Sequence, residues 1–91
     1  MEFEWDRAKA KSNERKYGIT FEVAAGVFED GNRTERLDAE SSEGEERWAT
    51  TGLIEGMEIY VVYAVRGEAI RLISARRASR YERDEYWNSK V

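Results

Sequence analysis

The stretch RWATTGLIEGMEIYVVYAVRGEAIRLISARR, residues 47–77, decides the fold of this chain. It is rich in β-branched and aromatic residues, which favour strands, and two glycine-containing dipeptides punctuate it. They divide it as follows: Arg47–Ile54, Glu55-Gly56, Met57–Arg66, Gly67-Glu68 and Ala69–Arg77. Two-residue connections of this composition are typical of β-hairpins. The stretch therefore predicts a meander of three antiparallel strands.

Tight turns also fix which residues lie opposite each other in neighbouring strands. With two-residue loops in both hairpins, Arg47 lies opposite Ala64, and Ala64 lies opposite Arg71. Two arginines then flank a small residue in one row across the three strands. The neighbouring rows on this face are expected to be Ala49–Val62–Ile73 and Thr51–Tyr60–Ala75.

The opposite face of the meander is bulkier and more apolar, so we expect it to form the core beneath the N-terminal helices. Its expected rows are Trp48–Tyr63–Leu72, Thr50–Val61–Ser74 and Val65–Ile70. Strict alternation also places Arg76 on this face, although it stands where the strand ends. A single bulge near Gly52 or Arg66 would reverse the parity and break the arginine row.

The segments around the meander carry helix signals. Asp6 and Thr20 are N-cap residues, and Gly18 is a typical end for the first helix. The apolar positions of the second helix have the spacing of a buried face: Phe21, Ala24, Ala25 and Phe28. After the meander, Ser79 and Glu82 match a capping box that opens a final helix, expected to run to about Ser89.

Two weaker strand signals and one loop complete the predicted fold. Residues 2–5 alternate polar and apolar like a short edge strand, residues 33–37 suggest a polar strand, and residues 38–46 form an acidic loop. The predicted class is α+β in a single domain, residues 1–91. Two N-terminal helices pack on an antiparallel sheet with the meander at its centre, and a helix ends the chain.

Composition restricts the chemistry. The chain has no cysteine and no histidine, so it lacks thiolate nucleophiles, the commonest metal ligands and the commonest general base. We therefore expect no metal site and no cofactor. The absence of a secretory segment or a long apolar run favours a cytoplasmic protein without a membrane partner.

Charge is distributed unevenly along the chain. Residues 1–46 hold 13 acidic and 7 basic side chains (−6), whereas residues 47–91 hold 6 acidic and 8 basic ones (+2). Between residues 71 and 83, five arginines face one acid, Glu82. This asymmetry indicates an anionic partner, since forked guanidinium groups bind phosphate bidentately. The alternative is a solvated sheet face on which Arg47 and Arg71 pair with Glu46, Glu58 or Glu82.

An ordered set of residues along nearly the whole chain resembles the BrnT toxin family. It comprises Phe3-Glu4-Trp5-Asp6, Lys9, Asn13, Lys16-Tyr17-Gly18-Ile19-Thr20-Phe21, Ala24, Val27-Phe28-Glu29-Asp30, Glu43-Gly44-Glu45-Glu46-Arg47-Trp48, Thr51-Gly52, Arg71-Leu72-Ile73-Ser74-Ala75-Arg76-Arg77-Ala78, Glu82-Arg83 and Tyr86. The resemblance implies a RelE-like fold and a type II toxin that halts translation as an endoribonuclease. It also implies a BrnA-like ribbon-helix-helix antitoxin, with operator DNA bound only through the antitoxin complex. At Tyr17, members of the family often carry histidine.

The leading hypothesis is a metal-independent ribonuclease in which the ribose 2′-OH attacks the adjacent phosphorus. The candidate catalytic residues are Arg47, Arg71 and Arg76 as charge stabilisers, with Glu46 or Glu82 as the base. The candidate RNA-binding residues are Arg77, Arg80, Arg83, Tyr60 and Tyr86. Glu82 is also a helix cap, and Tyr86 could equally dock the final helix. The alternatives are a non-catalytic nucleic-acid- or antitoxin-binding module that uses the same arginines, and a DNA-binding regulator, for which no helix-turn-helix spacing is evident.

Overall fold

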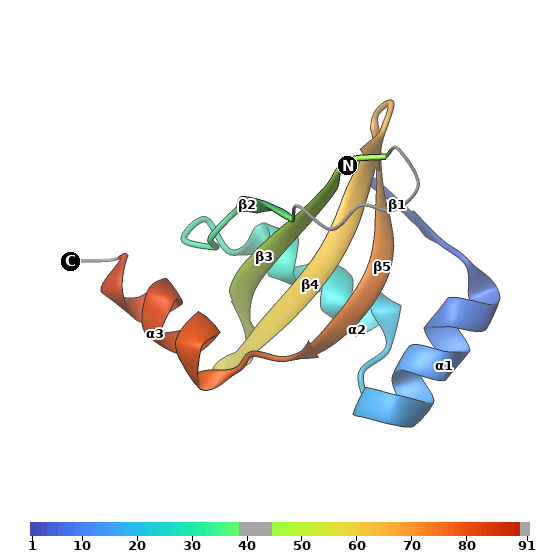
Figure 1. Ribbon diagram of the computed structural model, residues 1–91. Coiled ribbons are helices and arrows are strands. Elements are labelled where there is room, and N and C mark those ends of the chain that lie inside the picture. The colour runs from blue at the N-terminus through green and yellow to red at the C-terminus, as the bar shows by residue number, and fades with distance from the viewer. Residues whose placement is uncertain (39–44, 90–91) are drawn as a thin grey trace.

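The computed structural model describes residues 1–38 and 45–89, which form three α-helices, a 3₁₀ helix and five strands (Figure 1). In chain order they are β1 (Glu2–Trp5), α1 (Arg7–Tyr17), α2 (Phe21–Ala24), the 3₁₀ helix η1 (Ala25–Glu29), β2 (Arg36–Asp38), β3 (Arg47–Ile54), β4 (Met57–Arg66), β5 (Ala69–Arg77) and α3 (Arg80–Asn88). The predicted α+β class is confirmed. Residues 39–44, most of the predicted acidic loop, lie outside the described residues.

The five strands form one sheet in the order β1-β5-β4-β3-β2. The strands β2 to β5 pair antiparallel, but β1 pairs with β5 in parallel. The expectation of an antiparallel sheet was therefore wrong, and the sheet is mixed. The reason is non-local: the N-terminal strand completes the sheet beside the last strand, to which no direct turn connects it.

Both hairpins of the meander close with two-residue turns. In the first turn, Glu55 and Gly56 have φ angles of 49° and 81°, the left-handed pair that matches the twist of the flanking strands. The register of β3 against β4 follows as predicted, with Trp48 opposite Tyr63. Close to the second turn, Ala64 lies opposite Arg71, also as predicted.

A β-bulge then changes the register of β5. Leu72 lies opposite Tyr63, but the next pair is Ser74 with Val62, so Ile73 is an extra residue. The parity of the strand reverses beyond this point. The expected rows are replaced by Ala49–Val62–Ser74, Thr51–Tyr60–Arg76 and Thr50–Val61–Ala75.

The bulge corrects the expected direction of Arg76. This residue lies opposite Tyr60 and not on the core face, where strict alternation placed it. The small Ala75 takes the core position instead and is fully buried. Without the extra residue, the strand would direct a guanidinium into the core, where a charge is costly to bury.

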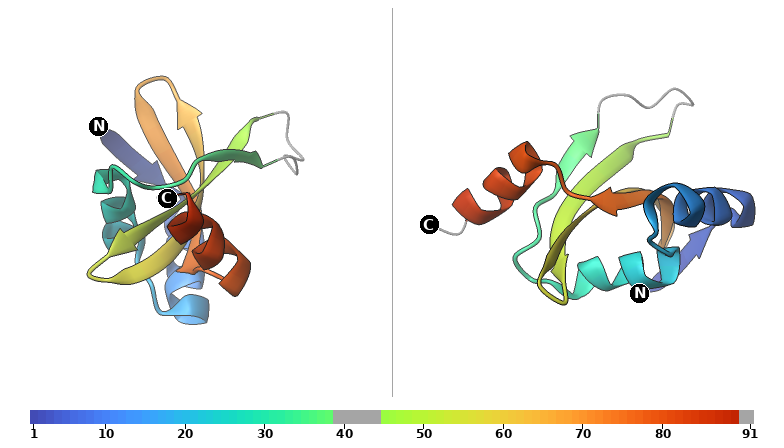
Figure 2. Two further views of the ribbon diagram at one scale, coloured as in Figure 1. Left: turned by 90° about the vertical axis from the view of Figure 1, so that its left-hand side faces the viewer. Right: turned by 90° about the horizontal axis from the view of Figure 1, so that it is seen from below.

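The N-terminal helical segments cover the apolar face of the sheet, as predicted (Figure 2). The buried cluster comprises Phe21, Ala24, Val27, Ile59, Val61, Tyr63, Leu72 and Ala75. The helix α1 begins at its Asp6 cap and ends at Gly18, whose φ of 72° is left-handed. The next helix has one α-helical turn after Thr20 and continues as η1, so Val27 is fully buried and Phe28 only partly.

The remaining elements frame the opposite face. The predicted polar strand is present as the shorter β2, at the edge beside β3. The helix α3 begins at the predicted capping box of Ser79 and Glu82 and lies apart from the α2–η1 layer (Figure 2). Among its hydrogen bonds to the rest of the molecule, Tyr86 donates to Asp30, and Trp87 donates to Glu58.

Candidate functional site

Four arginines stand on the sheet face that the N-terminal helices leave uncovered. We call this the arginine face, and its arginines are Arg36 (β2), Arg47 (β3), Arg71 and Arg76 (β5). Small, buried residues form its floor between them: Ala49, Thr51 and Ala64. These floor residues are almost fully covered, each with an exposed fraction of 1% or less.

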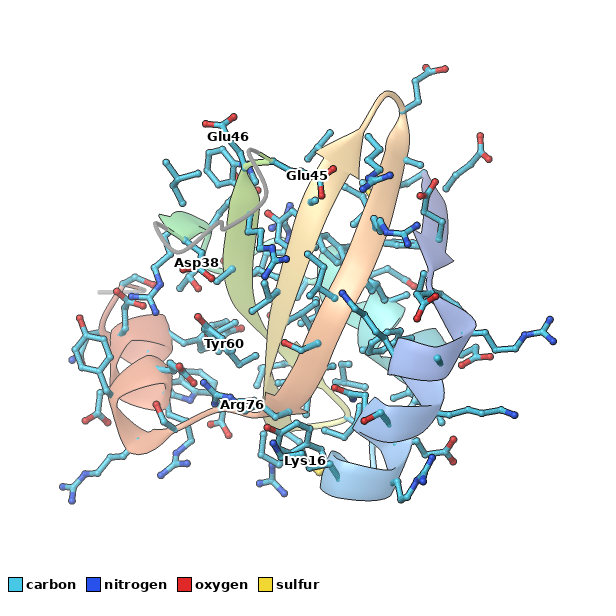
Figure 3. All side chains as sticks on the ribbon, turned by 45° about the vertical axis from the view of Figure 1, so that its right-hand side comes forward. Lys16, Asp38, Glu45, Glu46, Tyr60 and Arg76 are labelled. Carbon is cyan, nitrogen blue, oxygen red and sulfur yellow. The ribbon has the colours of Figure 1, made fainter. Side chains whose placement is uncertain are left out.

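At one end of this face, two arginines are arranged around Tyr60 of β4. The guanidinium carbon of Arg76 lies 4.4 Å from the centre of the Tyr60 ring, and that of Arg36 lies 5.9 Å from it. Arg36 also donates a hydrogen bond of 3.3 Å to the Tyr60 hydroxyl. Two cations therefore share one aromatic ring, an arrangement stabilised by the negative ring face. Figure 3 shows Tyr60 and Arg76 together near the base of α3.

Glu82 holds Arg76 in this position. Its two carboxylate oxygens accept hydrogen bonds of 2.9 Å from the two terminal nitrogens of Arg76. One of these oxygens also accepts from the backbone N–H of Ser79, completing the capping box. The Glu82 side chain is 8% exposed and that of Arg76 is 34% exposed, so the carboxylate is buried while the guanidinium still reaches solvent.

The electrostatics of this pair favour the charged forms. Burial by itself raises the pKa of Glu82, but the hydrogen bonds from Arg76 and Ser79 outweigh it, and the pKa is lowered. The hydrogen bond to Glu82 in turn raises the pKa of Arg76. A carboxylate with a lowered pKa and both oxygens engaged is a poor proton acceptor. Glu82 is therefore suited to positioning Arg76.

Arg47 and Arg71, the arginines of the predicted row, stand at the other end of the arginine face. Arg71 lies opposite Ala64 and pairs with Glu4 of β1 at 3.0 Å, in a partly exposed ion pair. Arg47 lies opposite Asp38 of β2. The carboxylate that holds Arg71 is therefore far more exposed than the one that holds Arg76.

The other predicted site residues are more dispersed. Glu46 is exposed just before β3 and lies away from Tyr60 and Arg76 (Figure 3). Arg77 is exposed opposite Ile59, on the core side of the sheet, and Arg80 is exposed at the start of α3. Arg83 donates to the carbonyl of Ala78.

Tyr86 docks α3 and does not reach the arginine face as a stacking platform. It is 1% exposed, and its hydroxyl donates to Asp30 at 2.6 Å. Of the two roles considered for Tyr86, its burial supports docking.

Two site residues were missing from the sequence-based prediction. Arg36 lies opposite Ala49, so it shares the face with Arg47. Glu85 is half-buried on α3 and contributes to the raised pKa of Arg36, after the larger effect of the Tyr60 hydrogen bond. Pairing the polar strand at 33–37 with β3 would have revealed Arg36. Nothing local to the sequence indicates that α3 brings Glu85 to β2.

Two kinds of feature are absent from the described residues. Within residues 1–38 and 45–89, no group of three or more acidic side chains is placed to hold a metal ion. No helix in the same part of the chain has the length and apolar character needed to cross a membrane.

These features define a small α+β protein with four arginines on the open face of its sheet, two of them in ion pairs with Glu4 and Glu82. Residues 5–82 match the family described as the ribonuclease toxin, BrnT, of type II toxin–antitoxin systems. The chain belongs to this family, as the resemblance in its sequence predicted. A search of curated proteins found no match. Membership implies an RNA target and an antitoxin partner, and the matched residues include all four arginines of the arginine face.

Proposed function

We propose that this chain is an endoribonuclease that cleaves RNA at the arginine face without a metal ion. The observation that carries the proposal is the fixed position of Arg76, which Glu82 grips through two hydrogen bonds while its ring contact with Tyr60 faces the open side of the sheet. Cations preorganised in this way stabilise charge that develops in a transition state without reorganisation during the reaction.

The proposed reaction is an internal transfer at phosphorus. The ribose 2′-oxygen forms a bond to phosphorus as the bond to the 5′-oxygen breaks, which yields a 2′,3′-cyclic phosphate and a 5′-OH end. Arg76 and Arg36 stabilise the doubly charged phosphorane. Arg47 and Arg71 bind the RNA strand farther along the face.

Two protons move in this scheme. Glu85, whose charge contributes to the raised pKa of Arg36 after the larger effect of the Tyr60 hydrogen bond, accepts the proton of the 2′-OH. Tyr60 donates its hydroxyl proton to the departing 5′-oxygen, and the proton held by Glu85 then returns to Tyr60 through solvent, which restores both groups. Glu82 positions Arg76. Glu46, the other predicted base, precedes β3, and the β3 residue opposite Tyr60 is Thr51, so this scheme gives Glu46 no part. Glu85→Gln should therefore lower kcat much more than Glu46→Gln.

Family membership supports the rest of the proposed function. We infer a RelE-like fold, action on RNA in the cytoplasm and arrest of translation. The partner is a BrnA-like ribbon-helix-helix antitoxin that neutralises the toxin, and the complex, not the toxin alone, binds operator DNA. A non-catalytic binding module with the same face is the alternative, and turnover distinguishes the two.

The test uses the purified, antitoxin-free chain with a structured RNA in EDTA, and the cut ends are mapped. Wild-type protein should leave 2′,3′-cyclic phosphates. Arg76→Ala should lose cleavage by about 10²–10³-fold, as loss of one preorganised donor does elsewhere. Arg7→Ala is the matched control, because Arg7 lines a pocket between α1 and α2 away from the arginine face. Tight RNA binding without cuts, with or without translating ribosomes, would favour the binding module.

A further inference from the structure

A second polar pocket lies between α1 and β5. It has a volume of about 250 Å³, and its polar lining consists of Lys9, Ser12, Asn13, Lys16, Tyr17 and Ser74. The lining contains two ammonium groups and three hydroxyls but no carboxylate. A lining of this kind suits an anion, since every charged group in it is a cation and the hydroxyls can donate hydrogen bonds.

One face of α1 supplies most of this lining. Lys9, Ser12 and Lys16 stand at positions i, i+3 and i+7, which lie above one another on a helix. The acidic Glu14 points elsewhere and lines the pocket between α1 and α2, together with Lys11. The helix therefore separates its charges, with only cations toward β5.

Asn13 fixes the floor of the pocket. Its amide nitrogen donates to the carbonyls of Ile19 and Ala75, and its amide oxygen accepts from the N–H of Ala75. Asn13 is buried, and these bonds join α1 to β5 across 62 residues of chain. The two walls of the pocket are thus held together before any ligand arrives.

The pocket adjoins the arginine face. The bulge at Ile73 directs Ser74 to the same side of β5 as Arg76, two residues farther along. Tyr17 lies close enough to Arg76 to add to its raised pKa, behind the larger effect of Glu82. Lys16 extends from the end of α1 that lies nearest to Arg76 in Figure 3.

We propose that this pocket is a phosphate subsite for RNA, in which Lys9 and Lys16 bind a backbone phosphate that flanks the one held at Arg76. The RNA strand then runs from Tyr60 across the bulge of β5 to α1. Ser12, Tyr17 and Ser74 supply hydrogen bonds to the same phosphate. The inference rests on the proposed function for its ligand, but it concerns binding and not cleavage.

The binding test uses a single-stranded 2′-O-methyl oligoribonucleotide, which lacks the attacking hydroxyl and is not cleaved. Fluorescence anisotropy is recorded over a series of KCl concentrations for Lys9→Gln, Lys16→Gln and Lys11→Gln. Glutamine is nearly as good a helix former as lysine, so α1 should persist in all three. Lys11→Gln removes the same charge from the same helix on its other side and is the matched control.

Each pocket variant should weaken binding about tenfold, the order expected for one charge-assisted hydrogen bond. The slope of log K against log[salt] should become shallower by roughly 0.7 for each phosphate of a single strand that the variant no longer neutralises. The control should change the affinity less than about twofold, because its charge lies outside the pocket. Equal reductions of affinity in Lys16→Gln and Lys11→Gln would overturn the proposal, because general charge would then explain both.

A cleavage comparison separates the subsite from the reaction. Lys16→Gln should lower kcat/KM on a long RNA but leave a dinucleotide with a single phosphodiester unaffected, whereas Arg76→Ala should impair both. If the wild-type protein binds RNA in a Lys16-dependent way but never cuts it, the proposed function fails and the subsite stands. If the pocket variants bind RNA normally and fail only to bind the antitoxin, the pocket is a protein-binding surface and the proposal is wrong.

Discussion

The two faces of the sheet are built from the same strands and hold together by different means. On the covered face, Ile59 and Val61 pack against α2 and η1 in a closed apolar cluster. On the arginine face, Tyr60 lies between guanidinium groups that stay in place through a carboxylate and an aromatic ring. If the proposed function holds, neighbouring residues of β4 serve different purposes: one set packs the core and the alternate set lines the reaction site. Substitutions should separate the two properties accordingly.

The largest expected effect is on the arginine face. Arg76→Lys keeps the charge but removes the two-pronged grip of Glu82, so the cation is no longer fixed above Tyr60. Cleavage should fall by roughly 100-fold in kcat/KM. The free energy of unfolding, measured by urea titration, should change by less than about 1 kcal/mol because an ion pair remains. A large decrease in stability with normal cleavage would reverse the assignment of the two faces.

The covered face should show the opposite behaviour in Gly52→Ala. A Cβ on Gly52 would lie 2.5 Å from the Val27 Cγ2 and 3.2 Å from its carbonyl oxygen, and Val27 is fully buried. Overpacking of this kind costs about 2 kcal/mol of unfolding free energy. Cleavage by the folded fraction should stay normal. Gly31→Ala, with nothing within 4 Å of the added atom, is the control and should be close to neutral.

Glu82 contributes to the free energy of unfolding and also positions Arg76. The pH dependence of stability tests its contribution. Glu82→Gln keeps the shape and the capping-box bond but removes the charge, which should cost about 1.5 kcal/mol at neutral pH. Because the folded-state pKa of Glu82 lies below its ordinary value of 4.5, its contribution is present above that value and is lost as the pH falls through the folded pKa. Stability curves recorded from neutral to strongly acidic pH should therefore converge for wild type and variant. Parallel curves would contradict this role.

The smallest expected effect concerns the docking of α3. Tyr86→Phe removes the hydrogen bond to Asp30, whose carboxylate still accepts from the N–H of Leu53. The cost should be about 1 kcal/mol at neutral pH. Burial and the bond to Asp30 raise the pKa of Tyr86 to about 12 from 10.0, so wild type should lose this contribution as the pH rises toward 12. The variant should show less alkaline destabilisation in thermal melts.

Short-range patterns predicted much of this molecule. The turn at Glu55-Gly56 determined the register of β3 against β4, and the caps at Asp6, Thr20 and Ser79 located the starts of the helices. These features depend on residues adjacent in sequence, so a local pattern contains the necessary information. The pairing of Ala64 with Arg71 belongs to this group because it lies close to the second turn.

The sequence-based predictions failed where segments far apart in the sequence contact each other. The bulge at Ile73 has no glycine or proline to announce it, and Asn13, far away on α1, bonds both backbone groups of Ala75 just beyond it. The parallel pairing of β1 with β5 and the approach of Glu85 to Arg36 are also long-range. Local sequence patterns therefore could not predict the end of the arginine face where Tyr60 and Arg76 meet.

The parallel pairing of β1 with β5 has a consequence for the time at which this chain can fold during synthesis. Glu2 lies opposite Ala69 and Trp5 opposite Leu72, so the first strand waits for the last one. The ladder that β1 joins can form only after residues 69–72 have left the ribosome, because loop closure over this distance precedes the contacts that reward it. Until then β1 has no strand to pair with, and the five-stranded sheet is incomplete.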